Sequence, residues 1–190
     1  MLNVRNKNAL AYITGVALGD GNLSNPNGRA IRLRITCDLK YPNIIEEIYK
    51  NLRIVAPNNK ISIIKKKAKA VDVSCYSNDW EKLLGWKVGS KLKQKVQVPT
   101  WIKEKQKYSI KCLQGLLQTD GSIYYDRGYC MINFVNHGEN LAKDVFSMIE
   151  SLGYRARMSI IAINTGTNKY TIRLVKDAER FIKYIKLEKK

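Results

Sequence analysis

The chain contains an internal repeat with an offset of one hundred residues. Asp20 and Asp120 occupy equivalent positions in its two copies. Ile13–Gly21 reads ITGVALGDG and Leu113–Gly121 reads LQGLLQTDG, so two mostly apolar stretches both end in Asp-Gly. Each stretch is followed by a hairpin pattern, a helical pattern, a second hairpin pattern and a short helical pattern. A repeat of this kind defines the structural unit. The order predicts an α+β protein of two pseudo-symmetric αββαββα halves.

The later parts of the repeat keep the same phase. Pro42–Leu52 and Leu141–Leu152 both carry apolar residues at helical spacing, and Leu52 and Leu152 are again one hundred apart. Strictly alternating segments around them predict one antiparallel sheet in each half. We place the N-terminal half at residues 1–97 and the C-terminal half at 98–190. The segment 86–107, rich in Lys and Gln, is predicted to connect them.

Net charge restricts the class of partner. Thirty-four Lys and Arg residues against sixteen Asp and Glu give a net charge of +18. Such an excess favours a polyanion, and nucleic acid is the first choice. A membrane surface is a poor fit, because the basic residues are spread along the whole chain. The apolar run Ala9–Leu18 is also too short to span a bilayer.

Cysteine and histidine usage argues against disulfides and against zinc. The chain has four cysteines and one histidine, and no two cysteines form a C-x-x-C pair. Buried free thiols are typical of a reducing compartment. We therefore expect an intracellular, cytoplasmic protein, with an organellar location left open.

The two Asp-Gly pairs are the strongest chemical signal. A carboxylate at a helix C-terminus is unfavourable, because the helix dipole already places negative charge there. Small residues four apart, Gly15 with Gly19 and Gly115 with Thr119, allow two helix backbones to pack closely. Such packing would make the two acids neighbours, which calls for a hard cation such as Mg²⁺. The alternative is a pair of ordinary helix-ending turns.

The strands contribute a basic face. In Ile31–Thr36 the apolar residues alternate with Arg32 and Arg34, so one face is core and the other presents guanidinium groups. A two-stranded ribbon fits the DNA major groove, where Arg pairs with guanine. A solvated basic face is the alternative. The candidate DNA-binding residues are Arg29, Arg32, Arg34, Lys65, Lys67, Asn133, Arg155, Arg157, Ser159, Thr171 and Arg173.

These motifs resemble the LAGLIDADG homing endonucleases, in the single-chain form that carries two motif copies. The resemblance covers nearly the whole chain. Each motif departs from the consensus: the first has Thr14 and Leu18 where the consensus has Ala and Asp, and the second has Gln114, Gln118 and Thr119. The duplicated arrangement, with both terminal acids and both following glycines, is the specific part.

The resemblance implies a monomeric, sequence-specific DNA endonuclease in which each half has a saddle-shaped sheet. Asp20 and Asp120, with the carbonyls of Gly19 and Thr119, would bind Mg²⁺ or Mn²⁺, and Ca²⁺ would bind with poor activity. Two-metal hydrolysis would then break both strands of a long, near-asymmetric target across the minor groove, leaving short 3′ overhangs.

The family also places a polar residue at the end of the second strand of each half and a lysine beyond the second hairpin. In the C-terminal half the polar residue resembles Asn136, and in the N-terminal half the matching place is Cys37 or Asp38. Lys91 is the first candidate for the lysine of the N-terminal half. The other candidates are Lys93 and Lys95 there, and Lys186 or Lys189 in the C-terminal half.

Two other functions remain in competition with the nuclease. An intron-splicing maturase would use the same basic surface to bind intron RNA. A non-catalytic DNA-binding protein could use the same scaffold, although the presence of both acids weighs against it. Competition between duplex DNA and folded intron RNA would distinguish the endonuclease from the maturase.

Overall fold

A computed structural model describes residues 2–66, 69–163 and 166–189. The N-terminal half contains α1 (Lys7–Asp20), β1 (Gly21–Ser24), β2 (Arg32–Asp38), α2 (Pro42–Val55), β3 (Ile61–Lys65), β4 (Ala70–Tyr76) and α3 (Trp80–Leu84). The C-terminal half repeats this order with α5 (Gln106–Thr119), β5 (Gly121–Asp126), β6 (Tyr129–Asn136), α6 (Glu139–Ser151), β7 (Ala156–Ala162), β8 (Asn168–Leu174) and α7 (Ala178–Ile185). The predicted α+β fold of two αββαββα halves is confirmed.

Each half builds one four-stranded antiparallel sheet with the same topology. The strand orders are β1-β2-β4-β3 and β5-β6-β8-β7, so the strands following the motif helices, β1 and β5, occupy equivalent edges. The registers also match: Gly21 pairs with Ile35 in the first sheet, and Gly121 with Phe134 in the second. This equivalence relates any strand position in one half to its counterpart in the other.

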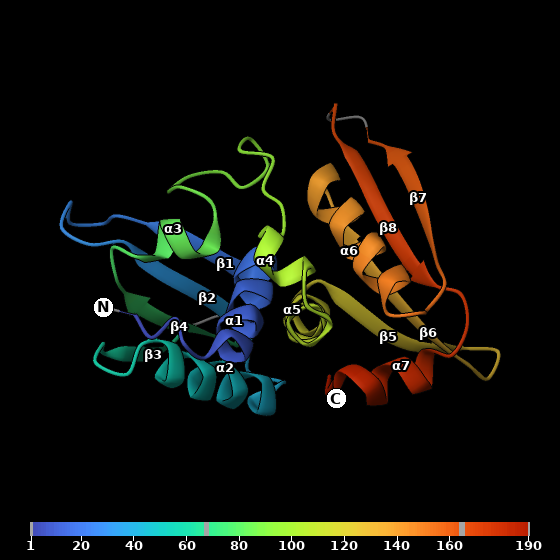
Figure 1. Cartoon of the computed structure of the whole chain (residues 1–190), viewed down its shortest axis with the longest axis horizontal. Helices are drawn as coiled ribbons and strands as arrows, with labels where there is room; N and C mark the ends of the chain where they lie inside the picture. Colours follow the sequence, from blue (N-terminus) through green and yellow to red (C-terminus); the bar gives the residue numbers. More distant parts are fainter. Residues whose placement is uncertain (1, 67–68, 164–165, 190) are drawn as a thin grey trace.

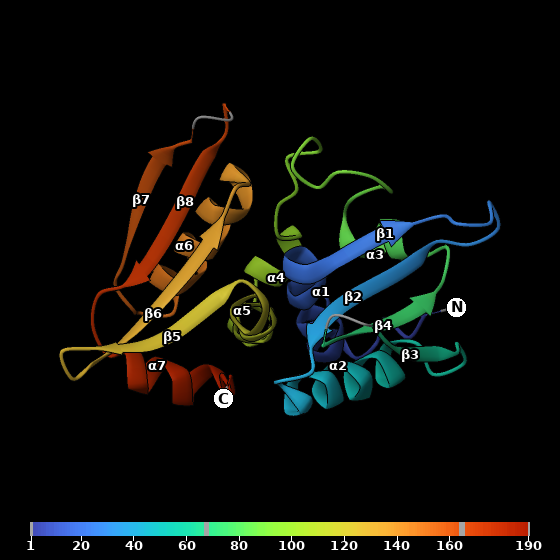
Figure 2. The same ribbon diagram turned by 180° about the vertical axis from the view of Figure 1, so that it is seen from behind.

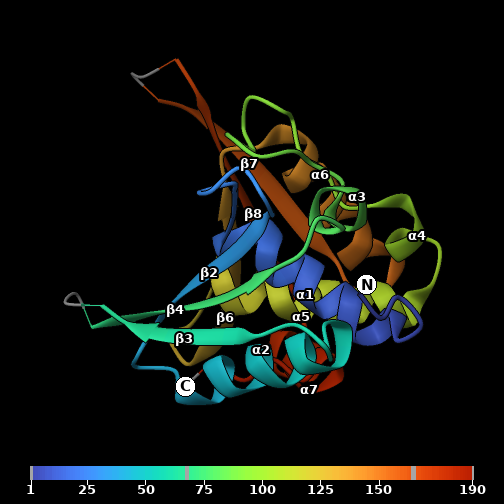
Figure 3. The ribbon, with the colours of Figure 1, turned by 90° about the vertical axis from the view of Figure 1, so that its left-hand side faces the viewer.

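Helices α1 and α5 lie side by side at the centre of the molecule, with one sheet on either side (Figure 1). Helix α1 is buried on nearly all sides, from Ala9 to Leu18, because it packs against α5, α2 and β2. Seen from behind, both sheets turn toward the viewer the face that the helices leave uncovered (Figure 2). The view from the side shows the twist of the N-terminal sheet above α2 (Figure 3).

The glycines after the two acids are required by close approach and not by a left-handed turn. Gly21 has φ −80° and ψ 149°, an extended conformation that any residue adopts. A Cβ built on it would lie 2.5 Å from the Cα of Ala17, one helical turn earlier. A Cβ built on Gly121 would collide in the same way with the backbone of Leu117. The chain thus leaves each motif helix directly as a strand, which fixes where the preceding Asp lies.

The connector contains one short element that the sequence patterns did not predict. Helix α4 (Thr100–Lys103) follows Pro99, and α5 begins at Gln106, inside the segment predicted as connector. The predicted second turn at residues 164–167 falls partly outside the described residues. Within the described parts of the chain, no helix combines the length and apolar character needed to cross a membrane.

Candidate functional site

The two motif helices meet through their glycines. A Cβ on Gly15 would collide with the carbonyl of Cys112, and one on Gly115 would lie 2.6 Å from the carbonyl oxygen of Tyr12. Farther along, a Cβ on Gly19 would collide with Thr119 and lie 3.4 Å from Cγ of Asp120. The backbones of α1 and α5 are therefore in contact around Gly15 and Gly115, and Gly19 packs against the side chain of Thr119. The C-terminal ends of the two helices lie together, as the spacing of small residues predicts.

The carboxyl groups of Asp20 and Asp120 share this junction. Asp120 is partly buried, and Asp20 remains accessible to solvent although protein surrounds much of its carboxyl group. Desolvation raises the pKa of both carboxyls, and the charge of Asp20 raises that of Asp120 further. The ammonium groups of Lys91 and Lys189 act in the opposite direction on both acids. Two acids and two lysines thus form one electrostatic unit.

Lys91 and Lys189 occupy equivalent places at the ends of the two helices. The Nζ of Lys91 donates to the carbonyl oxygens of Ala17, Leu18 and Gly19 at 3.1, 2.6 and 2.5 Å. The Nζ of Lys189 donates to those of Thr119 and Gly121 at 3.0 and 2.6 Å. A cation at a helix C-terminus is stabilised by the helix dipole. Burial lowers the pKa of Lys91 to about 8 and also lowers that of Lys189, while both acids oppose the shift.

The structure selects among the lysines that sequence reasoning left open. Lys91 and Lys189 reach the helix ends. The carbonyl of Lys186 accepts a hydrogen bond from Gln114, so its backbone rather than its ammonium contacts the motif helix. Lys93 and Lys95 contact the connector through their backbone nitrogens.

Strand register also decides between Cys37 and Asp38. Because Ile35 is equivalent to Phe134, Cys37 is equivalent to Asn136. Asn136 donates from Nδ2 to Oδ2 of Asp120 at 2.9 Å. Cys37 is buried, and its pKa is raised to about 12, mainly by desolvation and then by the negative charge of Asp20. The N-terminal half therefore presents a protonated thiol where the C-terminal half presents an amide.

Most of the candidate DNA-binding residues lie on the uncovered faces of the sheets. Arg34 is opposite Ser74 and Asn22, on the face away from the buried Leu33 and Ile35. Arg29 is exposed in the connection between β1 and β2. In the second sheet the cross-strand pairs are Asn133 with Arg173, Arg157 with Arg173, and Ser159 with Thr171, and Arg155 is exposed just before β7.

The position of Lys65 differs from that of the other candidate DNA-binding residues on the strands. Lys65 is opposite Val71, which is buried in the core, so register places Lys65 on the other face from Arg32 and Arg34. The alternation of the short strand KISIIKK left its phase ambiguous, because apolar residues occupy both faces. Lys67 lies outside the described residues. Lys66 instead forms an ion pair of 3.0 Å with Asp72, which is on the uncovered face.

A polar network next to the site was not predicted. The carboxylate of Glu47, on α2, accepts from Gln114 and Gln118 on α5 at 2.9 Å each. Tyr12, on α1, donates to Gln118 at 2.7 Å. Gln114 and Gln118 are both 3% exposed. Their four-residue spacing in the mostly apolar second half of α5 was the available signal, since two buried amides on one face require partners.

The helix ends suit a hard cation. Among the residues that the structure describes, no group of three or more His, Cys, Asp and Glu side chains is placed to hold a metal. An ion at this junction would depend on Asp20, Asp120 and backbone carbonyls. The carbonyl oxygens of Gly19 and Thr119 already accept hydrogen bonds from ammonium groups, so they face positive charge. An all-oxygen donor set of this kind fits Mg²⁺ or Mn²⁺.

The fold and the paired acids define a two-repeat α+β protein whose motif helices end in a shared acidic junction. Residues 107–186 match the family model of the LAGLIDADG-like domain. The C-terminal half thus resembles the LAGLIDADG family, and nearly the whole chain shares its fold with a solved LAGLIDADG domain. No curated protein sequence matches the chain.

Solved structures share this fold over almost the full chain. The crystal structure of I-DmoI in complex with DNA and Mn has a TM-score of 0.65 at 19% identity, covering 97% of each chain. Mesophilic variants of the homing endonuclease I-DmoI give 0.67 at 18% identity, covering 94% of this chain and 95% of theirs. Full-length DUF199/WhiA from Thermatoga maritima gives 0.66 at 14% identity, covering 96% of this chain and 56% of its own. Because all three identities are below 20%, these similarities establish the fold and not an activity.

Proposed function

We propose that the chain is a monomeric, sequence-specific DNA endonuclease that depends on a divalent metal. One observation carries the proposal: two acids meet at the glycine-packed ends of two equivalent helices, each end contacted by a lysine ammonium. Such a convergence of perturbed titratable groups is typical of catalytic sites. The similarity to I-DmoI in complex with DNA and Mn supports the same reading. We also propose the boundary between residues 97 and 98 as the division of the halves.

Asp20 and Asp120, with the carbonyls of Gly19 and Thr119, would hold Mg²⁺ or Mn²⁺. When bound, such an ion activates water as a nucleophile and stabilises the leaving oxygen of a phosphodiester. Ca²⁺ is expected to bind in the same place with poor activity; I-DmoI has been crystallised with DNA and Ca. Asn136 fixes the orientation of one carboxylate, because it donates to a single oxygen of Asp120.

The lysines supply fixed positive charge close to the position where a phosphate would lie. Their Nζ atoms contact the helix-end carbonyls and interact with both acids. Fixed charges of this kind stabilise negative charge that develops in a transition state without reorganisation. One lysine from the connector and one from the C-terminal segment would serve the two strands of a duplex.

The uncovered sheet faces would read the target. They carry Arg32, Arg34, Arg157 and Arg173 on the side away from the core, and arginine recognises guanine edges in the major groove. The two faces differ in sequence at nearly every position. A long target without strict two-fold symmetry follows from that difference.

The test is selection of cleaved molecules from a randomised duplex library in Mg²⁺. We expect a defined double-strand break and a consensus sequence, both lost in Asp120→Asn. Competition with folded intron RNA forms the second arm. RNA binding that exceeds binding to the selected duplex, without DNA cleavage, would favour the maturase function instead.

A further inference from the structure

The last residues of the chain return to the central helices, and polar side chains fix their path. Beyond α7, Lys186 has φ 55° and ψ 48°, and its N–H and that of Leu187 bond back to the end of α7. The left-handed conformation of Lys186 therefore ends α7 and turns the chain away from the line of the helix. Leu187 is then buried, at 4% exposure. This C-terminal segment, residues 186–189, brings Lys189 to the end of α5.

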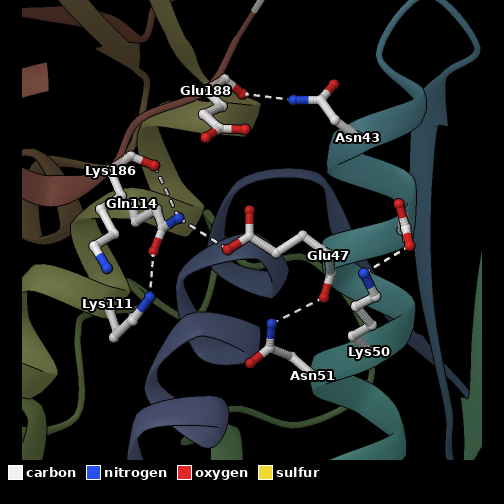
Figure 4. Close-up of a pocket in the computed structure, with 9 residues that line it drawn as sticks. Asn43, Glu47, Lys50, Asn51, Lys111, Gln114, Lys186 and Glu188 are labelled. Atoms are coloured by element: carbon white, nitrogen blue, oxygen red, sulfur yellow. Dashed lines mark hydrogen bonds and ion pairs between the residues drawn. The ribbon is translucent and has the colours of Figure 1, made fainter. Parts of the chain in front are cut away.

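Three side chains fix this segment, and two of them belong to the opposite half of the protein. Asn43 of α2 donates to the carbonyl of Glu188 at 3.3 Å, and Gln114 of α5 donates to the carbonyl of Lys186 at 3.0 Å. Glu47 of α2 accepts from the same amide nitrogen of Gln114 at 2.9 Å. Figure 4 shows these residues converging on a cleft of about 420 Å³ between α2 and the C-terminal half. We call Asn43, Glu47 and Gln114 the clamp.

The orientation of the Gln114 amide depends on its neighbours. Lys111 donates to its Oε1 at 2.8 Å, and Glu47 accepts from its Nε2. Together they leave the second N–H of Nε2 directed at the carbonyl of Lys186. Glu47 is held in turn by Gln118, which Tyr12 contacts. Because Gln114 and Gln118 are buried, an amide that lost Glu47 would be left without its partner.

Lys91, the equivalent lysine of the N-terminal half, has separate support. The connector segment that carries Lys91 is held by Gln94, whose side-chain amide hydrogen-bonds to the N–H and the carbonyl of Lys87. Glu81 also holds it, by accepting from the N–H of Val88. Neither interaction involves the clamp. Loss of the clamp should therefore affect one helix end and not the other.

We propose that Asn43 and Glu47, on α2 of the N-terminal half, are positioning residues that hold the C-terminal segment so that Lys189 reaches the half-site of the other repeat. The proposal deepens the endonuclease function and rests on it for its catalytic consequence. The partners of these two side chains are the carbonyl of Glu188 for Asn43, and Gln114 and Gln118 for Glu47, and neither Asp20 nor Asp120 is among them. Each acts through the segment that carries Lys189.

Hydrogen exchange on the full-length protein tests the clamp without any cleavage. Asn43→Ala and Glu47→Ala should speed exchange in the peptide covering residues 186–189, while peptides from α1 and α5 keep their protection. Glu46→Ala is the matched control, since Glu46 lies on the same helix and its ion pair with Lys50 is exposed. Unchanged exchange in the C-terminal peptide of Asn43→Ala would overturn the proposal, even if Glu47→Ala failed to fold.

Cleavage of a selected duplex, labelled differently on each strand, tests the consequence. Lys189→Met should slow one strand by about tenfold or more relative to the other, and Glu47→Ala should shift the ratio in the same direction. The double variant should be no slower than Lys189→Met alone. Equal slowing of both strands by Glu47→Ala would indicate a merely structural role. A wild-type protein that cut no duplex would overturn the endonuclease function, while the exchange experiment would still decide whether the clamp holds the segment.

Discussion

The side-chain amide of Asn136 bridges the backbone and the acid of the C-terminal motif. Its Oδ1 accepts from the N–H of Gly138 at 2.8 Å, and its Nδ2 donates to Oδ2 of Asp120 at 2.9 Å. The first bond fixes the direction of the amide, so the second constrains the carboxylate. Asp20 has a thiol, Cys37, at the equivalent register position. The two halves of the site are therefore chemically unequal.

We expect Asp20→Asn and Asp120→Asn each to abolish double-strand cleavage while largely preserving DNA binding. Replacing a carboxylate with an amide removes the charge needed to hold a divalent ion, and we expect a loss of at least about 10²-fold in rate. Cleavage in Mg²⁺ and binding in Ca²⁺ should be measured on the same duplex. If either single variant cuts both strands at the normal rate, the acids do not share a metal site.

Cys37→Asn should bring the two strand-cleavage rates closer together. An amide at this position could donate to Asp20 as Asn136 does to Asp120, whereas a thiol is a weak donor. The reciprocal variant Asn136→Cys should slow the strand served by the C-terminal half. Strand-resolved kinetics on a duplex with two labels provide the measurement. Identical rate ratios in the wild type and both variants would contradict the inequality inferred here.

Arg32→Ala and Arg34→Ala should weaken binding to the preferred sequence by about 1–3 kcal/mol and relax selection at a few base pairs. Both arginines lie on the uncovered face of the N-terminal sheet. Lys65→Ala is the control, because register directs Lys65 to the opposite face. Binding to duplexes that differ at single base pairs gives the readout. A uniform loss on all sequences would reassign the arginines to phosphate contacts.

DNA affinity should fall steeply with added salt, as expected for a chain of net charge +18. Arg29 and Arg155 are exposed outside the strands, in the connection between β1 and β2 and just before β7. If both contact phosphates, replacing them with Ala should reduce the slope of log K against log salt by about 2. Titrations at several salt concentrations measure this slope. A flat response in the wild type would rule out a surface that follows the DNA backbone.

We expect the buried thiol of Cys37 to make the protein less stable at alkaline pH. Burial, with smaller effects from Asp20 and Asp72, raises the pKa of its thiol from 9.0 to about 12. Between these values the folded state keeps a proton that the unfolded state has lost, so the free energy of unfolding decreases as pH rises. The slope attributable to this thiol is about 1 kcal/mol per pH unit above pH 9. Denaturant unfolding should be measured for the wild type and Cys37→Ala from pH 8 to pH 10. The difference between their free energies of unfolding should become smaller as the pH rises.

The sequence predicted the fold well because its repeat is written in local patterns. Asp-Gly at both helix ends, alternation in the strands and helical spacing in α2 and α6 are each visible within about fifteen residues. Helix α4 was missed because four residues carry no periodicity. Lys65 was included among the candidate DNA-binding residues because its short strand has isoleucines on both faces, so alternation did not fix the phase.

Residues inside a motif were predicted from the motif itself, whereas Lys91 and Asn136, which lie outside the motifs, were predicted only from the family resemblance. Asp20, Asp120, Gly15 and Gly115 were found from the motifs. Lys189 could not be distinguished from Lys186, because that choice depends on the path that the chain takes after α7. The choice between Cys37 and Asp38 depended on cross-strand register, and Glu47 is polar on an amphipathic helix, where charge is normally solvated.

At Gly15 and Gly115, the contact between α1 and α5 places main chain directly against main chain, with no intervening layer of side chains that could expand or compress. In a nuclease built this way, the offset between the two cuts is set by peptide geometry rather than by side-chain identity. The sheets are then free to acquire new target preferences by substitution while the stagger of the broken ends stays constant.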